Sequence, residues 1–370
     1  MLSIILGFFR STWAFIVVLG VLVFVHEFGH YLAARWRGVR VDVFSIGFGR
    51  SITSWTDKAG TVWKLAWIPL GGYVKLHGQE RPQDVADDVR ASWMPGQTFH
   101  DKSVLSRAIV VAAGPIANFL LAIVLFAGLY IFVGQPVTLP VVGSVVPDGA
   151  AARAGLIAND RVIAIGDEPI NTFEDLQRIV STHPGQTLAM TIQRDGADRR
   201  IDVTPESHAS GINRVGLLGV RGGLTEYRHV SVPAALWGGV RQTWVITSET
   251  FKGVAQMISG ARGTEELGGP LRIAQLSGQV AQLGVASLIS FIAMLSVNLG
   301  LINLFPIPVL DGGHLLFYLA EALRGRPLPA RAQEYGFRAG LAVLACLFVF
   351  ATWNDLTQIG LFRWVAGLVG

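Results

Sequence analysis

Cysteine is almost absent from this sequence of 370 residues, which contains only Cys346. A single cysteine excludes an intrachain disulfide, so the fold does not depend on a disulfide framework. Charged residues are also scarce: they make up 15% of the chain, whereas soluble domains average about 25%. With 51% hydrophobic residues as well, the chain is predicted to contain a membrane domain.

Several common signals are missing too. The net charge of +4 is not gathered into a basic stripe, so we expect no nucleic-acid partner. No G-x-S-x-G sequence occurs, which argues against a serine intramembrane protease. The N-terminal apolar run has no small-x-small cleavage site after it, so we expect a retained span and not a signal peptide.

Four segments are apolar enough to cross a bilayer, for which about 20 mostly apolar residues are needed. They are Trp13–Ala34, Ala108–Val133, Leu288–Phe305 and Phe337–Trp353. We therefore predict a polytopic α-helical membrane protein with about four transmembrane helices. A long stretch of ordinary soluble composition separates the second span from the third.

The distribution of Lys and Arg predicts the orientation of these spans. Basic residues are concentrated in the loop 35–107 and in the connection 324–331, while the two tails hold only Arg10 and Arg363. The positive-inside rule places both basic loops in the cytoplasm. Both termini and the region 134–287 should then lie on the opposite side of the membrane.

The soluble stretch begins with a pattern of short β-rich runs and turns. One helix is predicted at Thr172–Ser181, with Asn171 or Thr172 as its N-cap. The sequence VPDGAAARAGLIANDRVIAIGDEPI resembles that of a bacterial, circularly permuted PDZ domain, except that Asn159 stands where the pattern often has glycine. The resemblance implies one extracytoplasmic PDZ-like α/β domain.

Two further segments have a distinctive pattern. Residues 41–78 are rich in β-branched and aromatic residues with Gly and Pro between them, which predicts a membrane-associated β-hairpin region. Residues 230–262 suit a helix on the membrane surface or, equally, one packed on the PDZ-like domain.

The predicted division of the whole chain is 1–36 with the first span, 37–103 with the hairpins, 104–134 with the second span, 135–222 as the PDZ-like domain, 223–284 as an amphipathic surface region, 285–312 with the third span, and 313–370 with the cytoplasmic connection, fourth span and tail.

The first span ends in His26-Glu27-Phe28-Gly29-His30, an H-E-x-x-H sequence. On a helix, positions four apart share one face, so His26 and His30 can bind one Zn²⁺ while Glu27 acts as a general base. The alternative is two packing histidines beside a charge at a helix end. Ionisable residues at membrane depth are costly without a partner, which favours the metal.

A catalytic zinc site usually has three protein ligands and one open position. The segment 303–314, NLFPIPVLDGGH, follows the third span, which runs in the same direction as the first and so ends at the same depth. Pro306 and Pro308 break the helix there, which lets Asp311 turn inward. Asp311 is the predicted third ligand and His314 the second choice. The alternative is that Asp311 merely caps a helix before a Gly-Gly turn.

Three motifs and the PDZ-like domain together resemble the site-2 protease family of intramembrane zinc metalloproteases. The resemblance rests on HEFGH, on GPIANF (114–119), on NLFPIPVLDGGH and on the intervening PDZ-like domain, and it extends over essentially the whole chain. Further matches are GFG (47–49), LGGYVK (70–75) and GGPLRIAQ (268–275).

The resemblance implies a role for each matching residue. His26, His30 and Asp311 would bind one Zn²⁺, Glu27 would be the catalytic base, and Asn303 would hold substrate or orient the site. Gly114 and Asn118 share a helix face, where a packing role is favoured, although Asn118 can also contact the site.

The resemblance also implies substrates and a location. The substrates would be single-pass membrane proteins already trimmed by another protease, such as anti-sigma factors or remnant signal peptides. The enzyme would lie in the bacterial inner membrane, with its PDZ-like domain and both termini periplasmic and its active site near the cytoplasm. The PDZ-like domain would exclude bulky outer domains or bind a new C-terminus. The hairpin region 41–78 is a candidate for holding unwound substrate by β-addition, and proline substitutions along Val62–Trp67 would test this.

Two functions of other classes compete with proteolysis. One is a non-proteolytic PDZ-bearing membrane scaffold with a structural zinc site, against which Glu27 argues, because a structural site needs no base. The other is a metal transporter, which would need polar residues along a pore, and the second and fourth spans offer almost none.

Overall fold

The structure of the protein is a computed structural model that describes residues 2–80, 85–210, 213–261, 263 and 268–358. The C-terminal tail with Arg363 thus lies outside the described residues. The chain divides into two compact units, one formed by Met1–Leu129 with Leu236–Gly370 and the other by Tyr130–Ala235. We call the second unit the α/β module.

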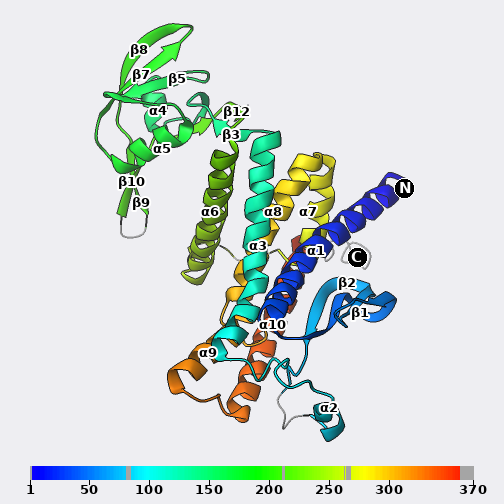
Figure 1. The fold of residues 1–370 in the computed structure, drawn as a ribbon. Coiled ribbons are helices and arrows are strands. Elements are labelled where there is room, and N and C mark those ends of the chain that lie inside the picture. Colours follow the sequence, from blue (N-terminus) through cyan, green and yellow to red (C-terminus); the bar gives the residue numbers. More distant parts are fainter. Residues whose placement is uncertain (1, 81–84, 211–212, 262, 264–267, 359–370) are drawn as a thin grey trace, which may run out of the picture. The chain divides into compact units, whose positions relative to one another are not determined.

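The described residues of the first unit contain four helices long and apolar enough to cross a membrane, as the sequence predicted. They are α1 (Leu2–Trp36), α3 (Val104–Phe132), α8 (Val285–Leu304) and α10 (Ala330–Gln358), shown in Figure 1. Shorter helices of this unit are α2 (Asp87–Ala91), α7 (Pro270–Gln282) and α9 (Asp311–Arg324).

Helix α3 packs closely against both α1 and α8 because glycines face it. A Cβ atom on Gly29 of α1 would lie 2.3 Å from the Ala113 carbonyl oxygen, and one on Gly300 of α8 would lie 3.1 Å from the Pro115 carbonyl oxygen. The Ser296 hydroxyl of α8 also donates to the Asn118 carbonyl oxygen at 2.8 Å. These contacts bring the H-E-x-x-H turn of α1 against the middle of α3.

The predicted hairpin region is an antiparallel pair, β1 (Val41–Thr56) and β2 (Val62–Leu76). Both strands fold back on themselves: residues 43–46 have partners in 62–65 and in 72–75, and residues 51–56 pair with 62–66. The run 62–65 is therefore paired on both sides, and the free edges are 51–56 and 72–76. A substrate strand cannot add along 62–65 without displacing a partner, so the β-addition predicted for the hairpin region is possible only at these two free edges.

Residues 230–262 were expected to be helical, and they contain α6 (Val232–Ile258). A Cβ atom on Gly239 would lie 2.5 Å from the Ile123 carbonyl oxygen of α3, and the Thr250 hydroxyl donates to the Asn298 amide oxygen of α8 at 3.1 Å. The helix thus contacts two spanning helices, which the sequence did not predict. Gly239 permits this contact, because it lets the two backbones approach closely.

The α/β module is built on a four-stranded antiparallel sheet in the order β6-β5-β7-β8, with the buried side chains of Val162, Met190 and Ile192 in its core. Its strands and helices are β3 (Gln135–Thr138), β4 (Val142–Val145), α4 (Ala150–Arg153), β5 (Arg161–Ile165), β6 (Glu168–Pro169), α5 (Phe173–Thr182), β7 (Leu188–Arg194), β8 (Ala197–Val203), β9 (Glu206–Ser210), β10 (Asn213–Leu217), β11 (Val220–Gly222) and β12 (Thr225–Arg228). Three two-stranded sheets, β3 with β12, β4 with β11 and β9 with β10, complete it.

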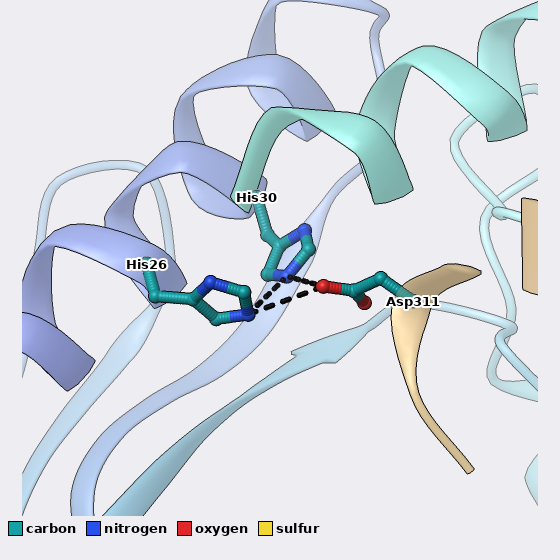
Figure 2. Close-up of side chains that lie close together, drawn as sticks. All are labelled: His26, His30 and Asp311. Carbon is teal, nitrogen blue, oxygen red and sulfur yellow. Dashed lines mark hydrogen bonds and ion pairs between the residues drawn. The ribbon is translucent and has the colours of Figure 1, made fainter. Parts of the chain in front are cut away.

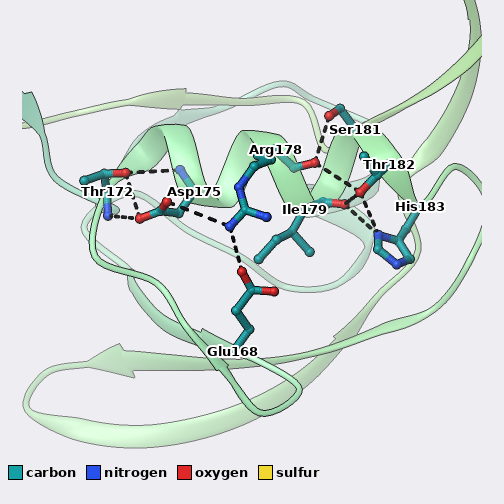
Figure 3. Close-up of polar contacts among 8 residues, drawn as sticks. All are labelled: Glu168, Thr172, Asp175, Arg178, Ile179, Ser181, Thr182 and His183. Atoms are coloured by element: carbon teal, nitrogen blue, oxygen red, sulfur yellow. Dashed lines mark hydrogen bonds and ion pairs between the residues drawn. The ribbon is translucent and has the colours of Figure 1, made fainter.

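Helix α5 begins where the sequence predicted, with Thr172 as its N-cap. The Thr172 hydroxyl accepts from the Asp175 backbone N–H at 3.1 Å, and the Asp175 carboxylate accepts from the Thr172 N–H at 3.0 Å, a reciprocal capping box (Figure 3). Asn159, at the usual glycine position of the PDZ-like pattern, has a φ of 71°. Asparagine tolerates this left-handed conformation better than most residues.

Candidate metal centre

Three predicted ligands converge at one point of the first unit. His26 and His30 project from the same face of α1, and Asp311 is the first residue of α9 (Figure 2). The two Nε2 atoms are 3.3 Å apart, and Oδ2 of Asp311 lies 3.2 Å from Nε2 of His26 and 3.5 Å from Nε2 of His30. In the described part of the chain, this is the group of His, Cys, Asp and Glu residues placed to hold a metal ion.

The chemistry of this group fits a zinc ion. Ligand atoms bound tetrahedrally at zinc–nitrogen distances near 2.0–2.1 Å are separated by about 3.3 Å, which matches the three separations found here. Oδ2 of Asp311 is buried and makes no hydrogen bond, so a cation would satisfy it. Two imidazoles and one carboxylate leave a fourth position open, as in catalytic zinc sites.

The orientation of both imidazoles depends on α3. Nδ1 of His30 lies 2.9 Å from the Val110 carbonyl oxygen, to which it can only donate, and this leaves the Nε2 lone pair for a metal. A Cβ atom on Gly114 would lie 2.3 Å from Nε2 of His30 and 2.9 Å from Cε1 of His26. Only glycine therefore leaves room for the two rings at this position.

Asp311 reaches the site because the chain turns sharply between α8 and α9. A Cβ atom on Gly312 would lie 2.2 Å from the Leu304 carbonyl oxygen, and one on Gly313 would lie 2.3 Å from the Ile307 carbonyl oxygen. The two glycines thus allow the first turn of α9 to fold onto the end of α8. The N-cap of α9 is Leu310, with no side-chain cap, so the alternative reading of Asp311 as a capping residue is wrong.

Glu27 lies beside the metal ligands and against the hairpin. Its carboxylate accepts a hydrogen bond from the Val74 backbone N–H of β2. A Cβ atom on Gly72 would lie 2.6 Å from the Ser45 carbonyl oxygen and 3.4 Å from Cγ of Glu27, so the glycine permits this close approach. The free edge 72–76 is therefore adjacent to the predicted catalytic base.

A cavity of about 710 Å³ contains the site, and Glu27, the three ligands, Asn303 and His314 line it. Asn303 faces this cavity, although its amide currently donates to the Leu299 carbonyl oxygen at 3.0 Å. His314 lies in the same wall but is not one of the three converging ligands. Asn118 is fully buried behind the ligands, with Nδ2 placed 3.2 Å from Nδ1 of His26.

The sequence did not reveal the roles of three residues: Val74 and Arg107, which line this cavity, and Gly72 beside Glu27. Val74 and Gly72 were part of a recognised pattern, but nothing local indicated contact with Glu27. Arg107 was counted only as a topology charge, yet its guanidinium donates to Glu321 at 2.6 Å and lies over the Tyr318 ring at 4.9 Å from its centre. Both contacts join α3 to α9, far apart in sequence, and no local signal could have shown them.

Four long apolar helices and a three-ligand centre beside a carboxylate define a membrane-embedded metalloenzyme. Residues 14–347 match the model of Peptidase family M50. A protein of Agrobacterium fabrum named as a zinc metalloprotease is 45% identical over 358 residues, covering 93% of this chain and 95% of its own. Metalloprotease MmpA of Caulobacter vibrioides is 36% identical over 397 residues, covering 98% of this chain and 99% of its own. The chain therefore belongs to the M50 peptidase family and is a zinc metalloprotease.

Proposed function

We propose that this enzyme is a site-2 protease that hydrolyses a peptide bond within or near the transmembrane segment of single-pass membrane proteins. The type is that of the bacterial regulator of sigma-E protease, with a single PDZ-like domain. One observation carries this proposal: His26, Glu27 and His30 lie inside the candidate span Phe9–Trp36. A reaction centre built into a spanning helix is suited to substrates that are themselves in the membrane.

The residues at this site have different roles in the proposed reaction. His26, His30 and Asp311 would hold Zn²⁺, which when bound polarises the scissile carbonyl and makes water a stronger nucleophile. Glu27 takes the proton from the attacking water and passes it to the leaving amine nitrogen. Glu27 and Val74 both line the cavity in which these transfers would take place.

The substrate must be unwound before it reacts, because a transmembrane helix keeps its carbonyl groups in internal hydrogen bonds. We propose that the unwound segment adds as a strand to the edge 72–76 of β2. Tyr73, Val74 and Leu76 of this edge line the cavity that contains the metal ligands. Main-chain pairing there would place an extended peptide beside Glu27 whatever its side chains are.

The α/β module would select the substrates. We propose that it is a PDZ-like domain on the periplasmic side of a bacterial inner membrane, together with both termini, while the active site lies near the cytoplasm. In this arrangement, a bulky outer domain is excluded until another protease has removed it. Anti-sigma factors and remnant signal peptides are the substrates that fit such regulated intramembrane proteolysis, with no role for nucleic acid.

Purified wild type and Glu27→Gln can be compared in detergent with zinc, on a single-span substrate with and without its outer domain. We expect wild type to cleave the trimmed substrate within its transmembrane segment and to spare the intact one. Glu27→Gln should bind zinc but lose cleavage, because only the base is removed. Cleavage outside the transmembrane region, or equal cleavage by Glu27→Gln, would refute the proposal.

A further inference from the structure

Asn118 occupies a place that packing alone does not explain. It lies in α3, is fully buried, and its amide reaches Nδ1 of His26 at 3.2 Å. Its Oδ1 is buried without a hydrogen-bond partner in the described part of the chain. A buried amide in a spanning helix costs free energy unless it makes a compensating contact. The contact it does make is with the side of a metal ligand that faces away from the metal.

The same face of α3 contacts the other histidine in an equivalent way. Nδ1 of His30 lies 2.9 Å from the Val110 carbonyl oxygen, which can only accept a hydrogen bond. Val110, Gly114 and Asn118 are spaced four residues apart and so line one face of the helix. Along this face, a carbonyl group contacts one imidazole, a glycine makes room for both, and an amide contacts the second.

The position of the proton on His26 follows from metal ligation. An imidazole that binds a metal through Nε2 carries its proton on Nδ1, and this proton needs an acceptor. The Nδ2 group of Asn118 cannot accept it. Half a turn of the amide brings Oδ1 to nearly the same place, and the two orientations have almost identical shape. With Oδ1 against Nδ1, His26 is held in the tautomer that His30 already has through Val110.

We propose that Asn118 is a positioning residue: its Oδ1 accepts the Nδ1 proton of His26 and so holds the Nε2 lone pair toward the metal. This inference rests on the zinc ion of the proposed function. Partners of this kind orient a metal ligand and increase its basicity, and their removal typically lowers metal affinity about 10- to 100-fold.

Zinc affinity, measured by competition with a chelator on the purified full-length protein in detergent, separates this role from packing. Asn118→Leu keeps the volume but removes the acceptor, and should bind zinc at least tenfold more weakly than wild type. Asn118→Asp restores an acceptor and should bind zinc at least threefold more tightly than Asn118→Leu. If Asn118 only packs, the order reverses, because a buried carboxylate is the more damaging of the two replacements.

Ser296→Ala is the matched control, because it removes the other hydrogen bond at this turn of α3, from the Ser296 hydroxyl to the Asn118 carbonyl oxygen. Its zinc affinity should stay within threefold of wild type. The absorption bands of bound Co²⁺ give a second readout, and they should shift in Asn118→Leu but not in Ser296→Ala, because only the former disturbs a ligand.

A loss below tenfold in Asn118→Leu, zinc binding by Asn118→Asp no tighter than by Asn118→Leu, or an equal loss in Ser296→Ala would overturn the inference. If Asn118→Leu does not fold, Asn118→Asp decides alone: affinity within tenfold of wild type supports the role, and a larger loss overturns it. A wild type that binds no zinc would instead refute the metal itself, a result distinct from all of these.

Discussion

At the scale of single residues, Gly114 is a position where one added carbon would directly disturb the metal ligands. A Cβ atom there would lie 2.3 Å from Nε2 of His30, well inside contact distance. We expect Gly114→Ala to lower zinc affinity tenfold or more and to reduce cleavage with it, because a ring must move away from the metal. Chelator competition and zinc content of the purified variant measure the effect.

Gly128→Ala is the control for Gly114→Ala, since it lies in the same helix and a Cβ atom there meets nothing within 4 Å. Alanine has a higher helix propensity than glycine, so a change in helix stability would affect both variants alike. Unchanged zinc affinity in Gly114→Ala would contradict the close approach of α3 to the two rings.

The environment of Asp160 indicates that the stability of the α/β module depends on pH. Its carboxylate is fully buried and accepts from Arg194 at 2.7 Å and from the Ile157 N–H at 2.9 Å. Burial by itself raises the pKa of Asp160, but these hydrogen bonds outweigh it and hold the pKa below its usual range. Because the pKa is lower in the folded state than in the unfolded chain, where it is about 3.9, the ionised carboxylate stabilises the folded state at higher pH. This contribution is lost progressively as the pH falls below about 4.

Asp160→Asn should therefore reduce the hydrogen-exchange protection of the module about tenfold at pH 7, through loss of charge-assisted hydrogen bonds. The ratio of protection between wild type and variant should fall toward one as the pH is lowered from about 4 through the lowered pKa of Asp160, where wild type also becomes protonated. Mass spectrometry of peptides from 161–165 and 188–194 gives this ratio at each pH. A ratio that stays constant with pH would show that the charge of Asp160 does not stabilise the module.

At the scale of elements, the double pairing of β1 with β2 determines where a substrate strand could be added. The two free edges are 51–56 and 72–76, and only the second lines the cavity. We expect Lys75→Cys to form a disulfide with a cysteine near the cleavage site of a substrate, and Thr53→Cys to form none. The test uses Glu27→Gln, which keeps the substrate intact, and Cys346→Ala, because Cys346 is exposed.

Both engineered positions are exposed strand residues, so a difference between them reports proximity to the substrate and not reactivity. Cross-linking at Thr53→Cys alone would show that the substrate lies at the edge 51–56. It would also exclude a role of the hairpin in aligning the scissile bond with Glu27.

Sequence patterns predicted some properties of the helices and strands and missed others. The start of α5 was predicted correctly, with Thr172 as one of two N-cap candidates, because it depends on residues within one helical turn. The pairing of 62–65 on both sides was missed, since alternation of residue types identifies strands but not their partners. The contacts of α6 with α3 and α8 were missed for a similar reason, as Gly239 has meaning only beside Ile123.

At the scale of the whole molecule, the distribution of Lys and Arg predicts which side of the membrane each part faces. Ser92→Cys lies in the basic loop and Asp198→Cys in the α/β module, and both positions are exposed. In intact bacterial cells carrying Cys346→Ala, a membrane-impermeant maleimide should label Asp198→Cys at once and Ser92→Cys only after permeabilisation. The reverse order of labelling would invert the proposed topology.

The sequence by itself determined the class of the molecule. Apolar runs of sufficient length, the four-residue spacing of His26 and His30, and the position of Asp311 after a span of the same direction are all properties of the linear chain. They predicted four membrane helices and three converging ligands. The broken helix around Pro306 also indicated that Asp311 could turn inward.

Only the tertiary structure decided how these groups are held. Val110, Gly114 and Asn118 act on His30 and His26 across 80 or more positions of the chain, and Val74 reaches Glu27 from strand β2. The physical reason is that ligand identity depends on residue type and local spacing, which a sequence displays directly. The orientation of each ligand depends on which backbone atoms and glycines face it from other elements, and these pairings exist only once the helices and strands have packed.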